Sequence, residues 1–182
     1  MAPVQAHWER IMELTAFIRD IPDWPKPGIV FKDITPLLSS PAALAMAVEQ
    51  MANPFRGRNV ELVVGAESRG FIFGTAVAQA LSAGFVPIRK PGKLPAETMA
   101  MRYELEYGTD ALEIHTDAIR LNQRVLIVDD LLATGGTMKT CCDLVKRLGG
   151  RLVGISVLIE LSFLSGVEKL NHYGDVHAVI RY

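Results

Sequence analysis

The sequence has few cysteines and no cluster of basic residues. The 182 residues include only two cysteines, Cys141 and Cys142, which are adjacent and would point in different directions from a helix. A disulfide between them is therefore not expected. Lys and Arg total 19 against 20 Asp and Glu, and no basic run forms a nucleic-acid arm or membrane anchor. The balance favours small molecules or a second subunit as partners, rather than nucleic acid or membrane.

Export and membrane signals are also lacking. The first ten residues have neither the basic start nor the apolar core of a secretory signal. No apolar run approaches the roughly 20 residues that a membrane helix needs. We therefore expect a cytoplasmic protein. The four histidines show no close ligand spacing, so a permanent zinc site is not expected either.

Two common nucleotide-binding motifs are absent. The chain has no Gly-x-x-x-x-Gly-Lys-[Ser/Thr] loop and no Gly-x-Gly-x-x-Gly turn, which argues against nucleoside-triphosphate hydrolysis and dinucleotide binding. The length suits one domain, and the 49% hydrophobic content is sufficient for a sizeable core. We expect a single domain over residues 1–182.

The most informative stretch covers residues 125–137. Its first four residues are apolar, mostly β-branched and too few for a helix, which predicts a buried parallel strand that ends at Asp129. Asp129 and Asp130 then lie at the carboxyl edge of the strand. A loop of small residues follows, and Thr137 opens an amphipathic helix. Backbone N–H groups in such a loop are directed at a phosphate.

Two carboxylates beside a phosphate loop indicate what the ligand is. Neighbouring carboxylates accept hydrogen bonds from a vicinal diol, or act on Mg²⁺ through water. A phosphate in the loop would place the rest of its molecule near Asp129 and Asp130. The residues therefore predict a sugar-phosphate site.

A second anion site is predicted in the turn at residues 66–70. Backbone N–H groups at a helix start, together with the guanidinium of Arg69, suit phosphate oxygens. Ser68 is an alternative as a hydrolase nucleophile. However, the spacing from Gly65 to Gly70 has one residue too many for a Gly-x-Ser-x-Gly elbow, and no partner histidine is evident.

Alternating strands and helices predict an α/β fold with a mainly parallel, twisted sheet flanked by helices. Glu160 then falls near the carboxyl end of a strand, as Asp129 does, at the edge where ligands are expected. The predicted strands cover residues 60–65, 85–89, 125–129, 151–161 and 176–180, and the predicted helices cover residues 41–52, 70–81, 137–148 and 165–170.

Two further segments do not fit that alternation. Residues 6–21 have apolar positions at helical spacing and predict an amphipathic helix, followed by prolines and a short edge strand or lining segment at residues 29–34. From Met101 the side chains alternate, with a turn expected at residues 108–110. This pattern predicts a β-ribbon, a form suited to a lid over an active site.

The strand, acids and loop of residues 128–137 resemble the phosphoribosyl-pyrophosphate signature of the type I phosphoribosyltransferases, and are most similar to the branch that acts on adenine. Residues 27–33 resemble the segment of that branch that covers the base, and residues 105–108 resemble its lid. The resemblance extends over nearly the whole chain. It implies a type I fold with an N-terminal hood at residues 1–34 and a flexible lid at 90–120, a homodimer, and Mg²⁺ as the cofactor.

The resemblance also implies roles for individual residues. The family commonly has Arg at the position of Lys32, and the two side chains are not equivalent. The ribose and 5′-phosphate would be bound by Asp129, Asp130, Ala133, Thr134, Gly135, Gly136 and Thr137. The pyrophosphate would be bound by Glu67, Ser68, Arg69, Arg89, Lys90 and Lys93. Adenine would be bound by Val30, Phe31, Lys32 and Leu161, with Tyr107 in the lid.

The implied reaction converts adenine and 5-phosphoribosyl 1-pyrophosphate to AMP and pyrophosphate, a step of purine salvage, through an oxocarbenium-like sugar. Glu106 is expected to handle the proton of the base, and Glu160 is its rival. Two alternatives stay open: a transferase for another base, either a 6-oxopurine or orotate, and a non-catalytic regulator that binds the same sugar phosphate.

Overall fold

The computed structural model describes residues 13–105 and 108–182, together with their side chains apart from those of residues 104, 105, 108 and 109. The chain separates into two compact units, Met1–Ala47 and Val48–Tyr182. The larger unit contains the sheet and the two acidic residues that the sequence singles out, and it is described first.

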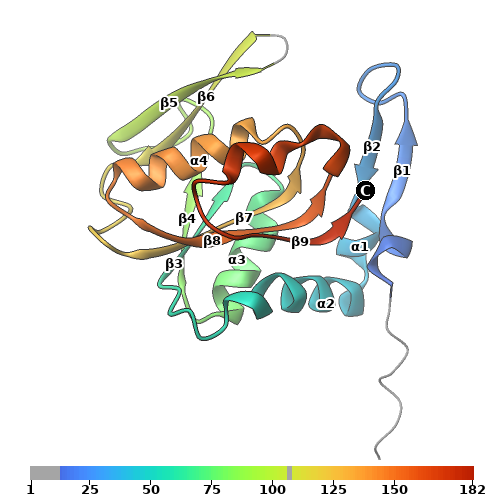
Figure 1. Cartoon of the computed structure of the whole chain (residues 1–182), viewed down its shortest axis with the longest axis horizontal. Helices are drawn as coiled ribbons and strands as arrows, with labels where there is room; N and C mark the ends of the chain where they lie inside the picture. Colours follow the sequence, from blue (N-terminus) through green and yellow to red (C-terminus); the bar gives the residue numbers. More distant parts are fainter. Residues whose placement is uncertain (1–12, 106–107) are drawn as a thin grey trace, which may run out of the picture. The chain divides into compact units, whose positions relative to one another are not determined.

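A five-stranded sheet organises the larger unit, with strand order β4-β3-β7-β8-β9 (Figure 1). Every neighbouring pair in it is parallel, which confirms the predicted fold class. The central strand β7 is bordered on both sides, so its apolar residues are shielded from solvent. The strands are β3 (Leu62–Ala66), β4 (Gly84–Ile88), β7 (Arg124–Leu132), β8 (Arg151–Glu160) and β9 (Val176–Arg181).

Helices cover both faces of this sheet. Helix α4 (Gly136–Arg147) lies on one face and α3 (Gly70–Ala80) on the other (Figure 1). Successive side chains of a strand point to opposite faces, and accordingly Val64 and Ile127 belong to the core cluster beneath α4. The hydroxyl of the fully buried Ser156 donates a hydrogen bond of 2.9 Å to the carbonyl of Met51, in the part of α2 (Pro41–Ala52) that belongs to this unit.

A two-stranded antiparallel ribbon extends from the sheet, as predicted. It consists of β5 (Thr98–Leu105) and β6 (Gly108–His115). Backbone hydrogen bonds between Arg89 and Glu113 attach the ribbon to the chain just after β4. The turn expected at residues 108–110 is wrong, because these residues already belong to β6 and pair with β5.

The smaller unit contains a 3₁₀ helix η1 (Leu14–Phe17), strands β1 (Arg19–Pro22) and β2 (Val30–Asp33), helix α1 (Thr35–Ser39) and the start of α2. The sequence pattern predicts one helix over residues 6–21. Within the described part of that range, residues 14–17 form a 3₁₀ helix, and the predicted continuation to residue 21 is wrong. Residues 19–22 form a strand because β2 provides an antiparallel partner for it. The strand at residues 29–34 is confirmed as β2, and the helix at residues 41–52 as α2.

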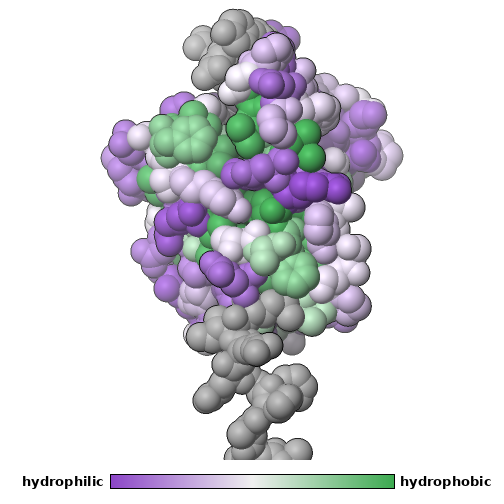
Figure 2. Space-filling view, turned by 90° about the vertical axis from the view of Figure 1, so that its right-hand side faces the viewer, coloured by the Kyte–Doolittle hydropathy of each residue, from purple (hydrophilic) through white to green (hydrophobic). Residues whose placement is uncertain are grey.

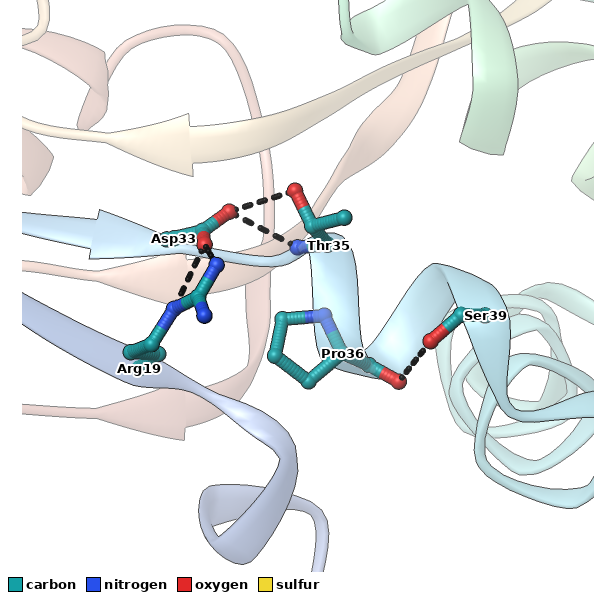
Figure 3. Close-up of polar contacts among 5 residues, drawn as sticks. All are labelled: Arg19, Asp33, Thr35, Pro36 and Ser39. Carbon is teal, nitrogen blue, oxygen red and sulfur yellow. Dashed lines mark hydrogen bonds and ion pairs between the residues drawn. The ribbon is translucent and has the colours of Figure 1, made fainter.

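Asp33 joins the end of β2 to the start of α1 (Figure 3). Its carboxylate accepts hydrogen bonds from the Thr35 hydroxyl at 2.6 Å and the Thr35 N–H at 2.9 Å, and forms an ion pair with Arg19 at 2.5 Å. These donors, the Thr35 hydroxyl foremost, lower the pKa of Asp33 to about 2. The segment that precedes α1 is therefore anchored at its carboxyl end.

Most of the remaining sequence-based elements are confirmed within a few residues. The main exception is β7, which continues through Asp129 and Asp130 to Leu132 instead of ending at Asp129. The short helix expected at residues 165–170 is the 3₁₀ helix η4 (Gly166–Leu170). Cys141 and Cys142 are buried, unpaired thiols.

The surface is mixed in character. Figure 2 shows one face of the molecule, on which apolar patches lie among hydrophilic side chains. The exposed large apolar residues include Trp24 and Val30 in the smaller unit and Phe163 in the larger one. None of the helices in the described part of the chain is long and apolar enough to span a membrane.

Candidate active site

A glycine-containing loop joins β7 to α4. Gly135 is the N-cap of α4 and has a φ of 79°, a left-handed conformation that glycine adopts at little cost. The backbone of this loop contacts the backbone of η4 so closely that a Cβ on Gly135 would collide with Gly166, and one on Gly166 would collide with the Ala133 carbonyl. Thr134, Gly136 and Thr137 complete the loop and the first helical turn. The loop is thus fixed by backbone packing, with the N-terminus of α4 behind it.

The two predicted carboxylates lie at the end of β7, beside this loop. The Asp130 N–H donates to Asp129 Oδ1 at 2.9 Å, and Asp130 Oδ2 pairs with Arg69 Nε at 2.7 Å. A Cβ on Gly70 would lie 2.6 Å from Asp129 Oδ1. The absence of a side chain at Gly70, the first residue of α3, therefore leaves space for the Asp129 carboxylate. Through its ion pair with Asp130, Arg69 connects the turn at residues 66–70 with the predicted sugar-phosphate site.

Burial raises the pKa of both carboxyl groups. Asp130 is 6% exposed. Removal from water raises the pKa of Asp129 well above its ordinary value, and the neighbouring Asp130 carboxylate adds to the shift. Burial also raises the pKa of Asp130, although the Arg69 guanidinium counteracts part of that increase. The site therefore keeps two acids side by side at an energetic cost, a common property of functional sites.

The predicted pyrophosphate-side residues lie together at the ends of β3 and β4. Glu67 Oε2 accepts from Arg89 Nε at 3.0 Å and from the Lys90 N–H at 3.1 Å. Arg89 Nη1 donates to the Lys93 carbonyl at 3.1 Å. Ser68 is exposed and follows a cis peptide bond from Glu67. Glu67 thus holds the Arg89 guanidinium and the backbone of Lys90, and Arg89 in turn contacts the backbone of Lys93.

A polar chain that the sequence reasoning did not identify connects this group to the loop. Thr137 Oγ1 donates to the Tyr103 hydroxyl at 3.5 Å, which donates to Asp110 Oδ2 at 3.3 Å. Lys90 Nζ pairs with the same Asp110 oxygen at 3.2 Å. The sequence pattern predicts a turn at Asp110. Its correct register on β6, opposite Tyr103, would have indicated the contact.

Glu160 is nearly buried, 7% exposed, at the end of β8. Its carboxylate accepts from Arg181 Nε at 3.1 Å and from the Ser162 hydroxyl at 3.3 Å. The next residue, Leu161, donates its N–H to the Leu132 carbonyl at 2.9 Å and so connects the ends of β8 and β7. Glu106 and Tyr107 lie outside the described residues.

The predicted adenine-covering residues belong to the smaller unit. Val30 is 49% exposed, and the Phe31 ring meets Trp24 edge-on with ring centroids 4.4 Å apart. Lys32 Nζ pairs with Asp20 at 2.7 Å. Their position over the base stays a prediction.

The carboxylates do not form a closed metal cage. In the described part of the chain, no group of three or more His, Cys, Asp or Glu side chains could hold a metal ion. Mg²⁺ keeps several waters and binds through one or two carboxylates plus substrate phosphates. Asp129 and Asp130 fit a Mg²⁺ ion of that kind, held through water and the substrate.

The loop, the carboxylates and the parallel sheet define a protein of the phosphoribosyltransferase class. A family model described as the phosphoribosyl transferase domain matches residues 35–175. This range includes the loop, Arg69, Lys90 and the whole ribbon.

Comparison with individual proteins narrows that class. The chain is 57% identical over 169 residues to an adenine phosphoribosyltransferase of Koribacter versatilis, covering 93% of this chain and 92% of the relative. The solved adenine phosphoribosyltransferase of Thermoanaerobacter pseudethanolicus is 53% identical, with a TM-score of 0.90 over 93% of this chain and 98% of its own. That of Saccharomyces cerevisiae, solved with adenine and an imino-altritol bisphosphate, is 38% identical, with a TM-score of 0.86 over 91% and 96%. The chain belongs to the adenine phosphoribosyltransferase family.

The raised pKa of Asp129 predicts that this carboxylate destabilises the fold. Its pKa lies above the ordinary 3.8. Between pH 3.8 and the raised pKa, the folded protein therefore retains a proton that the unfolded chain has lost, and the free energy of unfolding falls as the pH rises. We expect Asp129→Asn to raise the free energy of unfolding at pH 8 by about 1 to 2 kcal/mol, and to change it little at pH 4. Urea unfolding at both pH values measures this.

Asp175→Asn is the control, because it removes an exposed carboxylate. An equal gain in both variants, or a loss of stability in Asp129→Asn at pH 8, would contradict the account.

Proposed function

We propose that the protein transfers a 5-phosphoribosyl group from 5-phosphoribosyl 1-pyrophosphate to adenine, giving AMP and pyrophosphate. The observation that carries this proposal is the phosphate loop at the N-terminus of α4 with Asp129 and Asp130 beside it. Family membership and the names of the relatives support adenine as the base. The reaction is a step of purine salvage.

The loop residues Ala133 to Thr137 bind the 5′-phosphate. Their N–H groups and the helix N-terminus favour an anion, and the Thr134 and Thr137 hydroxyls add donors. Asp129 and Asp130 accept hydrogen bonds from the ribose 2- and 3-hydroxyls. Their negative charge also stabilises the positive charge that develops on the sugar as the bond from C1 to pyrophosphate loosens.

The departing pyrophosphate needs positive charge on the other side of the sugar. Arg69, Arg89, Lys90 and Lys93 provide it, and the Ser68 hydroxyl donates a hydrogen bond. Glu67 positions two of these residues through its contacts with Arg89 and the Lys90 backbone. Mg²⁺, held by the substrate and by water on Asp129 and Asp130, would neutralise further charge on the pyrophosphate.

The base is recognised by the main chain of Val30, Phe31 and Lys32 and by Leu161. Glu106 handles the base proton, as acid to the purine or as holder of the neutral tautomer, and Tyr107 closes over the site with the lid. The two donors that already bind Glu160 support this choice, because a carboxylate engaged by Arg181 and Ser162 is less available to a base.

The remaining proposals concern the whole molecule. Residues 1–182 act as one phosphoribosyltransferase domain, with residues 1–34 as the hood over the base and 90–120 as a flexible lid that excludes water from the reactive sugar. The protein acts as a homodimer in the cytoplasm.

A competition between bases tests the assignment. We expect pyrophosphate release and AMP formation with adenine, and turnover at least about a hundredfold lower with hypoxanthine, guanine or orotate, because a site built to hydrogen-bond one base leaves polar groups unpaired with another. Chromatographic detection of nucleotides measures this. Equal or better use of another base would reassign the enzyme. Binding of the sugar phosphate without turnover of any base would indicate a regulator.

Two glutamate variants separate the candidates for the base proton. We expect Glu106→Gln to lower the single-turnover rate about 10²- to 10⁴-fold, the usual share of a general acid or base, and to leave binding of ribose 5-phosphate unchanged. Glu160→Gln should lower thermal stability more than the rate, because it weakens the pair with Arg181. An unchanged single-turnover rate in Glu106→Gln would remove this residue from the mechanism.

A further inference from the structure

One oxygen of Asp110 has two side-chain partners that come from different parts of the site. Lys90 Nζ lies 3.2 Å from Asp110 Oδ2, and the Tyr103 hydroxyl lies 3.3 Å from the same atom. The other oxygen, Oδ1, accepts the N–H of Ala111 at 2.8 Å. Asp110 is therefore held from three directions, and only the contact with Lys90 involves a residue proposed to bind pyrophosphate.

The orientation of the Tyr103 hydroxyl follows from its second contact. Thr137 Oγ1 donates to this hydroxyl at 3.5 Å, so the hydroxyl proton is directed at Asp110. The Tyr103 ring packs against the core cluster beneath α4, which restricts its movement. Tyr103 thus offers Asp110 a donor that does not depend on Lys90.

Lys90 differs from Tyr103 in mobility and charge. Its side chain is 56% exposed, and its backbone is fixed by the hydrogen bond to Glu67. The long side chain can therefore exchange one anionic partner for another while the backbone stays in place. A pyrophosphate bound nearby would compete with Asp110 for the ammonium group.

We propose that Asp110 is a positioning residue: it forms an ion pair with Lys90 when the site is empty, and competes with pyrophosphate for the Lys90 ammonium group. When Lys90 moves to pyrophosphate, the Tyr103 hydroxyl remains as a hydrogen-bond donor to Asp110. This inference rests on the proposed function, in which Lys90 binds pyrophosphate. Asp110 lowers the affinity for pyrophosphate and so favours its release after the transfer. Tyr103 raises the affinity for pyrophosphate, because a carboxylate that also accepts a hydrogen bond from Tyr103 holds Lys90 less tightly.

Opposite signs in two variants test the proposal. In calorimetric titrations of the full chain with Mg²⁺ and pyrophosphate, we expect Asp110→Asn to bind pyrophosphate about two- to fivefold more tightly, the range of an exposed ion pair. We expect Tyr103→Phe to bind it about twofold more weakly, since Lys90 then becomes the only side-chain donor to Asp110 among the described contacts. In the double variant Tyr103→Phe with Asp110→Asn, this weakening should disappear.

Three controls keep the result specific. Asp175→Asn changes the net charge equally and breaks an Asp–Arg pair of 2.9 Å elsewhere, and should leave the affinity unchanged. Tyr173→Phe removes the hydrogen bond from the Tyr173 hydroxyl to Asp143, and should also leave the affinity for pyrophosphate unchanged. In a Lys90→Met background, Asp110→Asn should no longer tighten binding.

The outcomes are distinguishable. A gain from Asp110→Asn that persists without Lys90 would reflect general electrostatics and overturn the proposal. Weaker binding in both Asp110→Asn and Tyr103→Phe would indicate structural damage and overturn it too. AMP formation by the wild-type protein, measured in parallel, reports on the proposed function separately. If wild type forms AMP and the two variants bind pyrophosphate like wild type, only the inference about Asp110 fails.

Discussion

Close backbone packing around the end of β7 is the constraint on which the site depends. At Gly70 a side chain would displace the Asp129 carboxylate, and at Gly135 and Gly166 it would separate the phosphate loop from η4. These contacts join α3, β7, α4 and η4 at the carboxyl ends of the strands. Acids and N–H donors can lie side by side there because no Cβ atoms separate them.

That packing also explains the electrostatic cost of the site. Asp129 and Asp130 lie too close together and too far from water to ionise easily, as their raised pKa values indicate. Arg69 offsets part of this cost through its contact with Asp130. A sugar with two hydroxyls and a developing positive charge would relieve it further. The substrate therefore completes a charge arrangement that the protein alone leaves unfavourable.

The sequence predicted the parallel sheet, its helices and the phosphate loop, because apolar runs and glycine-rich turns are local signals. Where it was wrong, a partner distant in sequence decided the structure: residues 19–22 form a strand because β2 pairs with them, and Asp110 lies in β6 because it pairs with Tyr103. The contacts of Gly166 with the loop and of Tyr103 with Thr137 depend on register and packing, which one sequence does not specify. The roles of Glu106 and Tyr107, which lie outside the described residues, stay predictions.

The most direct test of the account is a crystal structure of the protein with AMP. We expect the phosphorus atom beside the N–H groups of residues 134–137, and both ribose hydroxyls within hydrogen-bond distance of Asp129 and Asp130. A phosphate bound at Arg69 and Lys90 instead, with the loop empty, would contradict the assignment of the two anion sites and the mechanism built on it.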